Sequence, residues 1–205
     1  KHLFTFGWKL LVSSLIDVVY NDLRQLIIGK LYTSADLAQY NRGKQLPHLI
    51  ITNINTSIDS VLLPTMAAEQ DDKARVRGMT RRAIKTSTYI MAPLMLGMAA
   101  VAEPMIRLLL TEKWLPCVPY MRIFCITYVF YPIHTANLNA IKAMGRSDLF
   151  LKLEIAKKVV GVTVLVCTMW FGVKAMAYSL LFTSLTSQII NSWPNRKLLE
   201  YGYLD

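Results

Sequence analysis

Long apolar stretches alternate with short charged stretches along the whole chain. A helix rises about 1.5 Å per residue, so stretches of about 20 apolar residues reach or nearly reach the ~30 Å of a bilayer core. Apolar blocks of this length between charged segments are typical of transmembrane helices. The pattern predicts about six of them, at residues 6–31, 46–68, 82–110, 119–144, 149–171 and 173–193.

The connections between these blocks carry turn chemistry. Thr33-Ser34-Ala35-Asp36 offers a helix N-cap, and Gly145-Arg146-Ser147-Asp148 forms a tight hydrophilic turn. Phe171-Gly172 leaves very little room between the last two helices. Short links force neighbouring helices to run antiparallel. We therefore expect an all-α fold, a polytopic transmembrane helical bundle with residues 1–205 in a single transmembrane domain.

The composition agrees with a membrane protein. Of 205 residues, 54% are hydrophobic and only 18% are charged, against about 25% charged in an ordinary soluble domain. The net charge of +10 raises the question of nucleic acid. However, the basic residues fall mostly in the gaps between apolar blocks, which favours an anionic membrane surface over a phosphate-tracking groove. We expect no nucleic-acid partner.

Lys and Arg are distributed unequally between the two sides of the predicted bundle. The side that holds the N-terminus and the connections after the second and fourth helices carries the larger share. Positive residues accumulate on the cytoplasmic side of membrane proteins. The pattern predicts a bacterial inner-membrane protein with both chain ends in the cytoplasm, as an even number of crossings requires. Because the chain begins at Lys1, we expect an internal fragment of a longer protein.

The helix at 6–31 has a polar face, formed by Ser13, Asp17, Asn21, Arg24 and Gln25. Asp17 and Arg24 are two turns apart, roughly 10 Å along the axis, which is too far for a direct ion pair. A charge at a helix centre costs about 2.5–3.5 kcal/mol on membrane insertion, so this face should not contact lipid. Two interpretations stay open: a water-filled pathway, or ion pairs with other helices.

Asp59 is the charged member of a second polar face, on the helix at 46–68. Its neighbours on that face are Thr52, Asn55, Thr56 and Ser60. Hydroxyl and amide side chains of this kind commonly form hydrogen bonds between membrane helices. Asp59 either joins those contacts or faces a cavity.

Three further polar residues are candidates for the same pathway. His134 lies deep in an apolar run, as either a packed, hydrogen-bonded histidine or a proton relay. Arg122 either extends to the membrane surface or lines a vestibule. Lys157 is a weaker cavity candidate, and snorkelling is its alternative; beside it we expect a Glu154–Lys158 ion pair at i,i+4 spacing.

The segment 69–82 is predicted to be a basic loop at the membrane interface. Its arginines, Arg75, Arg77, Arg81 and Arg82, would contact anionic lipid headgroups. A charged loop in solvent is the alternative, and the two are compatible.

Motifs of soluble enzymes are missing from the sequence. It contains no HExxH, GxSxG or GxGxxG pattern, and Gly29-Lys30 and Gly43-Lys44 lack the other residues of a phosphate-binding loop. His2, His48 and His134 have no metal-ligand spacing. We expect no enzyme, no cofactor and no metal.

Several short runs resemble one known family. They are Phe6–Leu11, Tyr20–Asp22, Leu26–Lys30, Tyr40–Lys44 with Pro47, Val61–Pro64, Leu109–Trp114 and Ala143–Asp148. These runs are similar to those of bacterial polysaccharide and lipopolysaccharide biosynthesis transporters, the Wzx-like flippases. That family belongs to a larger group with the MATE drug exporters and the MurJ lipid II flippase. The resemblance extends over nearly the whole chain.

The resemblance implies a transporter of two lobes and about 12 to 14 helices, with this chain forming most of the second lobe. The implied activity is movement of an undecaprenyl-diphosphate-linked oligosaccharide to the periplasmic leaflet by alternating access. The implied partners are this substrate, membrane lipids and the remaining lobe, with the polysaccharide polymerase machinery as a further candidate. In that setting, polarity and depth assign the headgroup pathway to Arg24, Asn21, Gln25, Arg122 and Lys157. The coupling ion or proton is assigned to Asp17, Asp59 and His134.

Other classes would need other features. A cation-coupled exporter of drugs or small solutes would have the same helices around a less cationic, more aromatic cavity. A membrane glycosyltransferase would need an acidic cluster, for which Asp71-Asp72 is the one weak candidate. A scaffold would not need charges on a single inward face.

Overall fold

A computed structural model describes residues 2–198, with the side chains of residues 2–6, 9, 17, 21 and 195–198 left outside the description. Within this range the chain is all-helical, as the sequence predicts, and it contains no strand. Its elements are α1 (His2–Leu31), α2 (Ser34–Ala68), α3 (Lys73–Ala100), α4 (Ala102–Leu110), the 3-10 helix η1 (Glu112–Cys117), α5 (Val118–Val129), α6 (Tyr131–Ala143), α7 (Ser147–Thr168) and α8 (Val173–Leu198).

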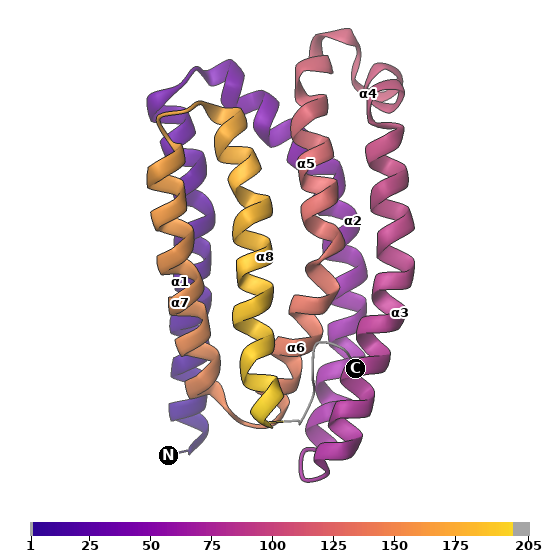
Figure 1. Cartoon of the computed structure of the whole chain (residues 1–205), viewed down its shortest axis with the longest axis vertical. Coiled ribbons are helices and arrows are strands. Elements are labelled where there is room, and N and C mark those ends of the chain that lie inside the picture. The colour runs from indigo at the N-terminus through magenta and orange to yellow at the C-terminus, as the bar shows by residue number, and fades with distance from the viewer. Residues whose placement is uncertain (1, 199–205) are drawn as a thin grey trace.

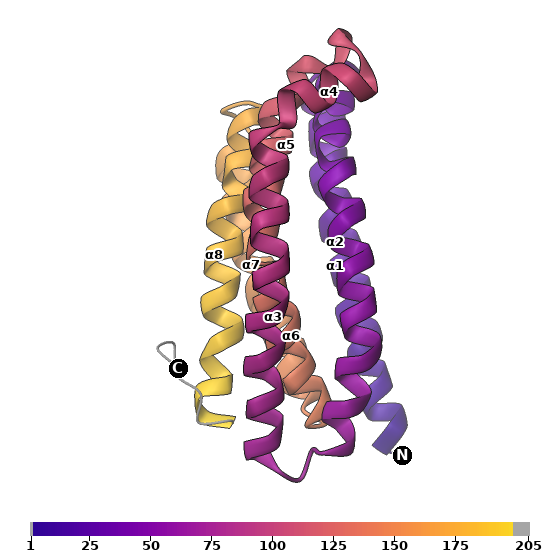
Figure 2. The same cartoon turned by 90° about the vertical axis from the view of Figure 1, so that its right-hand side faces the viewer.

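The long helices run side by side along one axis (Figure 1). The α1–α2 and α7–α8 connections lie at one end together with α4, which we call the upper end; the α2–α3 and α6–α7 connections lie at the opposite, lower end. α1 packs against α7, α2 against α5 and α6, α3 against the same two helices, and α7 against α8. Figure 2 shows α1 and α2 on one side of the bundle and α3 and α8 on the other.

The start of α2 is set by a capping box at Thr33. Thr33 Oγ1 accepts a hydrogen bond of 3.1 Å from the Asp36 backbone N–H, and Asp36 Oδ2 accepts one of 3.2 Å from the Thr33 N–H. The predicted N-cap is therefore confirmed. The helix begins at Ser34, well before the predicted residue 46. Hydropathy missed the first turns because they are polar.

The predicted loop 69–82 is much shorter in the structure. α3 begins at Lys73, and Asp72 Oδ1 caps it by accepting a hydrogen bond of 3.0 Å from the Arg75 backbone N–H. The four arginines assigned to the loop therefore stand on the first turns of a helix. The prediction overlooked the cap because it read this charged segment as a connection.

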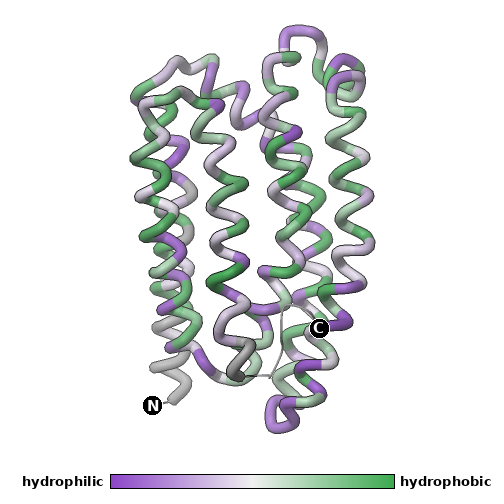
Figure 3. Tube along the Cα trace, viewed as in Figure 1, coloured by the Kyte–Doolittle hydropathy of each residue, from purple (hydrophilic) through white to green (hydrophobic). Residues whose placement is uncertain are grey.

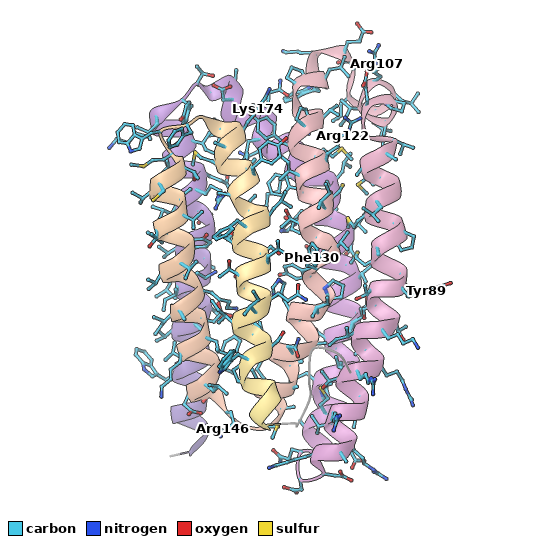
Figure 4. All side chains as sticks on the ribbon, in the orientation of Figure 1. Tyr89, Arg107, Arg122, Phe130, Arg146 and Lys174 are labelled. Atoms are coloured by element: carbon cyan, nitrogen blue, oxygen red, sulfur yellow. The ribbon has the colours of Figure 1, made fainter. Side chains whose placement is uncertain are left out.

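Two of the predicted long helices are broken. Residues 82–110 divide between α3 and α4, which meet at Val101 with a bend of 71°. Residues 119–144 divide between α5 and α6 at Phe130, near the middle of the bundle (Figure 4). Pro132 explains this second break, because proline donates no backbone hydrogen bond and its ring crowds the preceding turn.

Many large apolar side chains are exposed on the helices. Figure 3 shows hydrophobic residues along much of the helices, with hydrophilic residues at the connections of both ends and at intervals between them. Trp8, Leu26, Trp170 and Phe171 are each more than half exposed. Tyr89 points outward from α3 (Figure 4). Judged by length and hydropathy, no helix of residues 2–198 is by itself a candidate membrane span, whereas α3 and α4 qualify together as a bent pair.

Close helix packing at the upper end depends on one glycine. A Cβ atom on Gly43 of α2 would lie 2.7 Å from Tyr120 Cβ and 2.9 Å from the Cys117 carbonyl oxygen. Tyr40, one turn earlier, packs edge-on against Tyr120 and Phe124 of α5. The contact between α2 and α5 thus holds one wall of the interior in place.

Candidate functional site

The helices line a partly open polar cavity of about 770 Å³, which falls within the usual range for ligand sites. Residues of α1, α2, α5, α6, α7 and α8 line it. Among the described side chains that line it, five are cationic: Arg24, Lys44, Lys142, Lys157 and Lys158. Three are acidic: Asp22, Asp59 and Glu154. The described lining residues therefore carry an excess of positive charge, even when the two histidines, His48 and His134, are counted as neutral.

Arg24 of α1 is the most deeply buried cation of the cavity, with only 4% of its surface exposed. Its Nη1 donates hydrogen bonds to the Met176 carbonyl oxygen and to Ser179 Oγ, the latter at 3.3 Å. Its Nη2 is buried without a hydrogen-bond partner, and no carboxylate among the described side chains forms an ion pair with it. A buried guanidinium in this state retains capacity for an anionic ligand.

The hydroxyl of Ser179 also takes part in this arrangement. It donates a hydrogen bond of 2.7 Å to the Met176 carbonyl oxygen, which is the same oxygen that accepts from Arg24. Tyr40 of α2 lies close enough to interact electrostatically with the guanidinium. Three helices thus hold the Arg24 side chain at the upper part of the cavity.

Asp59 and His134 lie farther down, each bound to a neighbouring helix. Asn139 Nδ2 of α6 donates a hydrogen bond of 2.6 Å to Asp59 Oδ1 of α2. His134 Nδ1 lies 3.3 Å from Asn191 Nδ2, and its Nε2 lies 3.5 Å from Ser184 Oγ. These contacts fit a neutral imidazole that connects α6 to α8.

The lysines of α7 have different partners from those expected. Lys157, not Lys158, pairs with Glu154, with 2.5 Å between Nζ and Oε1. Lys158 Nζ instead lies 4.4 Å from the ring centre of Tyr20 on α1, in cation–π geometry. The expected Glu154–Lys158 ion pair is therefore wrong: the i,i+3 neighbour Lys157 reaches the carboxylate, and Lys158 is directed toward Tyr20.

A series of aromatic rings from α2, α5 and α6 follows the cavity. Tyr40, Phe124, Tyr128 and Tyr131 are successive neighbours, with ring centres 5.3, 5.9 and 6.1 Å apart. All four line the cavity, but Tyr131 is the most exposed at 44%. The rings form one wall that is rigid and largely apolar.

The structure brings together only some of the residues predicted from the sequence. Arg24, Gln25, Asp59, His134 and Lys157 all line the cavity. The side chains of Asp17 and Asn21 lie outside the described part of the chain.

Arg122 does not line the cavity. It is exposed on the side of α5 that faces α3, near the upper end, where its Nε donates a hydrogen bond of 3.3 Å to the Ala99 carbonyl oxygen of α3 (Figure 4). The structure places it outside this cavity because the face of α5 that carries it packs beside α3, and its assignment to the headgroup pathway stays a prediction.

The basic residues of α3, Arg75, Arg77, Arg81 and Arg82, also lie away from the cavity, at the lower end. Arg75 is engaged by two carboxylates, Glu69 at 2.6 Å and Asp72 at 3.8 Å. Arg81 and Arg82 are exposed.

Sequence reasoning missed two cavity lysines, Lys44 and Lys142. For each lysine, the sequence places other polar residues on the same helical face. Lys44, His48 and Thr52 follow one another at i,i+4 spacing on α2, and Thr135, Asn139 and Lys142 have the same kind of periodicity on α6. Both lysines stand at or just outside the ends of the predicted helices 46–68 and 119–144, where a charged residue is expected at the membrane surface. Among the described residues, no cluster of three or more His, Cys, Asp or Glu could hold a metal ion.

The fold and the site define an all-helical protein with an apolar exterior and a cationic interior cavity. The chain belongs to the polysaccharide biosynthesis protein family, whose sequence model matches residues 1–119. The resemblance to Wzx-like proteins predicted from the sequence is thereby confirmed.

Three curated relatives are similar to this chain. The teichuronic acid biosynthesis protein TuaB of Bacillus subtilis is 26% identical over 73% of the chain and 31% of its own length. An uncharacterized membrane protein in the cps region of Klebsiella pneumoniae is 24% identical over 100% of the chain and 40% of its own length. The lipopolysaccharide biosynthesis protein WzxC of Escherichia coli is 24% identical over 91% of the chain and 37% of its own length.

The chain thus spans between about a third and two fifths of the length of these relatives. No solved structure matches it significantly. Its family and relatives support a membrane protein of polysaccharide biosynthesis.

Proposed function

We propose that this chain is part of a flippase that moves an undecaprenyl-diphosphate-linked oligosaccharide from the cytoplasmic to the periplasmic leaflet. Transport occurs by alternating access, without ATP hydrolysis and without an enzymatic step. The oligosaccharide is destined for a surface polysaccharide, which agrees with the names of the relatives TuaB and WzxC.

The observation that carries this proposal is the buried Arg24 guanidinium. A diphosphate is anionic and offers several acceptor oxygens, and arginine binds such groups through paired hydrogen bonds. Arg24 Nη2 has no hydrogen-bond partner, so it can donate to the ligand without first breaking a bond. The cost of burying this charge is offset when the headgroup is bound.

The remaining assignments complete the transport cycle. Asp59 and Asp17 together bind the coupling cation or proton. His134 relays a proton between α6 and α8. Gln25 and Lys157 contact the headgroup along its path. The remaining lobe of the longer protein closes the cavity, and the polymerase machinery receives the product. The lower end of the bundle faces the cytoplasm.

A second candidate is a cation-coupled exporter of drugs or small solutes. The wall of aromatic rings from Tyr40 to Tyr131 favours it, since flat apolar ligands stack on such surfaces. The excess of lysine and arginine in the same cavity favours the flippase, because a cationic drug would be repelled.

The test is a strain that lacks the gene of the full-length protein. We expect lipid-linked oligosaccharide repeat units to accumulate on the cytoplasmic face and the restored gene to clear them. The variant Arg24→Gln should leave them in place, whereas Arg122→Gln, which changes an arginine outside the cavity, should clear them. Normal surface polysaccharide in the deletion strain, with no accumulation, would overturn the flippase and favour the exporter.

A further inference from the structure

Arg24, Lys44 and Lys142 line the cavity and form no ion pair with a described carboxylate, and of these three Lys142 stands at the lower end. It stands in the last turn of α6, at the lower end, and lines the polar cavity. Its Nζ lies 4.6 Å from the ring centre of Phe150 on α7. Within residues 2–198, no described carboxylate forms an ion pair with it. Its ammonium group therefore keeps its hydrogen-bond donors available to an anion.

Lys142 and Arg24 are far apart along the bundle. Arg24 contacts Ser179 of α8, and Asn191 of the same helix contacts His134 of α6. From Ser179 to Asn191 the axis advances about 18 Å, and Lys142 lies about two further turns along α6 from His134. A single diphosphate group is much shorter than this distance, so it cannot contact both cations at once.

The charge between the two positions is partly compensated. Lys157, which acts electrostatically on His134, is already paired with Glu154. Asp59 adds a further negative charge. Its Oδ1 accepts a hydrogen bond from Asn139, which lies one turn before Lys142 on α6. An anion that moves along the cavity therefore meets a favourable position at each end and a less favourable region between them.

We propose that the cavity binds the phosphate headgroup at two successive positions, first at Lys142 near the lower end and then at Arg24 near the upper end. This inference rests on the proposed function and adds a loading site to it. The ligand of the Lys142 site is a phosphate or diphosphate ester that carries a lipid chain. The headgroup is handed from the lysine to the arginine as the protein changes between its two access states.

Unpaired polar atoms mark the path between the two positions. Asn55 Nδ2 and Asn191 Oδ1 line the same cavity and are buried without hydrogen-bond partners, with 7% and 1% of each residue exposed. A buried polar group without a partner is costly. A donor and an acceptor on facing helices suit a ligand that carries both phosphate oxygens and sugar hydroxyls.

The experiment counts bound lipids on the full-length protein in nanodiscs by native mass spectrometry. The probe is undecaprenyl diphosphate, with phosphatidylglycerol as the competing phospholipid. We expect up to two probe molecules on the wild type, one on Lys142→Gln, one on Arg24→Gln and none on the double variant. Lys152→Gln changes an exposed lysine of α7 and should retain two.

Affinity gives a second readout. Each glutamine variant should bind the probe about tenfold or more weakly at the position that it changes. Lys142→Arg, which keeps the positive charge, should restore the affinity of the Lys142 site. A melting temperature equal to that of the wild type shows that Lys142→Gln is folded. If the melting temperature is lower, the probe binding of Lys142→Gln is compared with that of Phe150→Leu, which removes the ring contact and keeps the lysine.

The outcomes separate this inference from the proposed function. If Lys142→Gln still binds two probes, or if Arg24→Gln abolishes all binding, there is only one headgroup position and the two-position proposal is wrong while the flippase stands. If neither variant alters binding, the headgroup role of the cavity is wrong as well. If equimolar phosphatidylglycerol displaces the probe from the Arg24→Gln variant, the Lys142 site is a general phospholipid site and the proposal is also overturned.

Discussion

Arg24 of α1 donates a hydrogen bond of 3.3 Å to the hydroxyl of Ser179 on α8, across the upper part of the cavity. The two residues are 155 positions apart in the sequence. No carboxylate among the described side chains forms an ion pair with Arg24, so this contact holds the guanidinium in place without neutralising its charge. Binding capacity and stability should therefore respond differently to changes at Arg24.

Replacement of Arg24 by methionine should abolish transport without loss of stability. Buried charges replaced by apolar side chains of similar size are often neutral or stabilising. We expect a melting temperature equal to or above that of the wild type, measured in detergent by thermal unfolding. A marked decrease in melting temperature would show that Arg24 serves mainly to hold α1 and α8 together. Ser179→Ala, which keeps the charge, is the matched control and should transport.

Gly43→Ala should loosen the contact between α2 and α5. The added Cβ would lie 2.9 Å from both the Cys117 carbonyl oxygen and the Met121 nitrogen, and neither backbone atom can move away easily. Overpacking of this kind costs about 1–3 kcal/mol of unfolding free energy. Gly78→Ala is the control, because nothing lies within 4 Å of its Cβ position. It should be neutral or slightly stabilising, since alanine favours a helix interior.

Asp59→Asn should separate coupling from folding. The asparagine keeps an oxygen that can accept from Asn139 Nδ2, so the α2–α6 contact survives. If Asp59 binds the coupling ion, transport in proteoliposomes should no longer respond to an imposed proton or sodium gradient. Asn139→Ala removes the contact instead; it should lower stability by about 1 kcal/mol and keep the response to the gradient. An unchanged response in Asp59→Asn would move the coupling site elsewhere.

The basic start of α3 should bind anionic lipid through Arg81 and Arg82. Replacing both by glutamine should reduce the number of phosphatidylglycerol molecules that stay bound in native mass spectra. The effect should be weaker at high salt, because exposed charges are screened. Arg75→Gln should have a smaller effect, since Glu69 and Asp72 already compensate this arginine. Equal losses in both variants would argue against a specific lipid surface.

The helical fold and part of the site could be predicted because hydropathy and helical periodicity are local properties. The polar face of α1 directs Arg24 inward for this reason. The prediction placed the start of α2 at residue 46 and not at Ser34, because it followed hydropathy and the first turns of this helix after the cap at Thr33 are polar. Glu154 pairs with Lys157, while Lys158 contacts Tyr20 of another helix, and the local i,i+4 pattern contains no information about such a contact between helices.

The most direct test reconstitutes the purified full-length protein in proteoliposomes with undecaprenyl-diphosphate-linked oligosaccharide in both leaflets. A membrane-impermeant glycosidase added outside digests only the outer leaflet, so further digestion reports movement across the bilayer. We expect the wild type to expose nearly all of the lipid to the enzyme, and Arg24→Gln to leave about half protected, as protein-free vesicles do. Protection of half the lipid with the wild type as well, or full exposure with Arg24→Gln, would contradict the account.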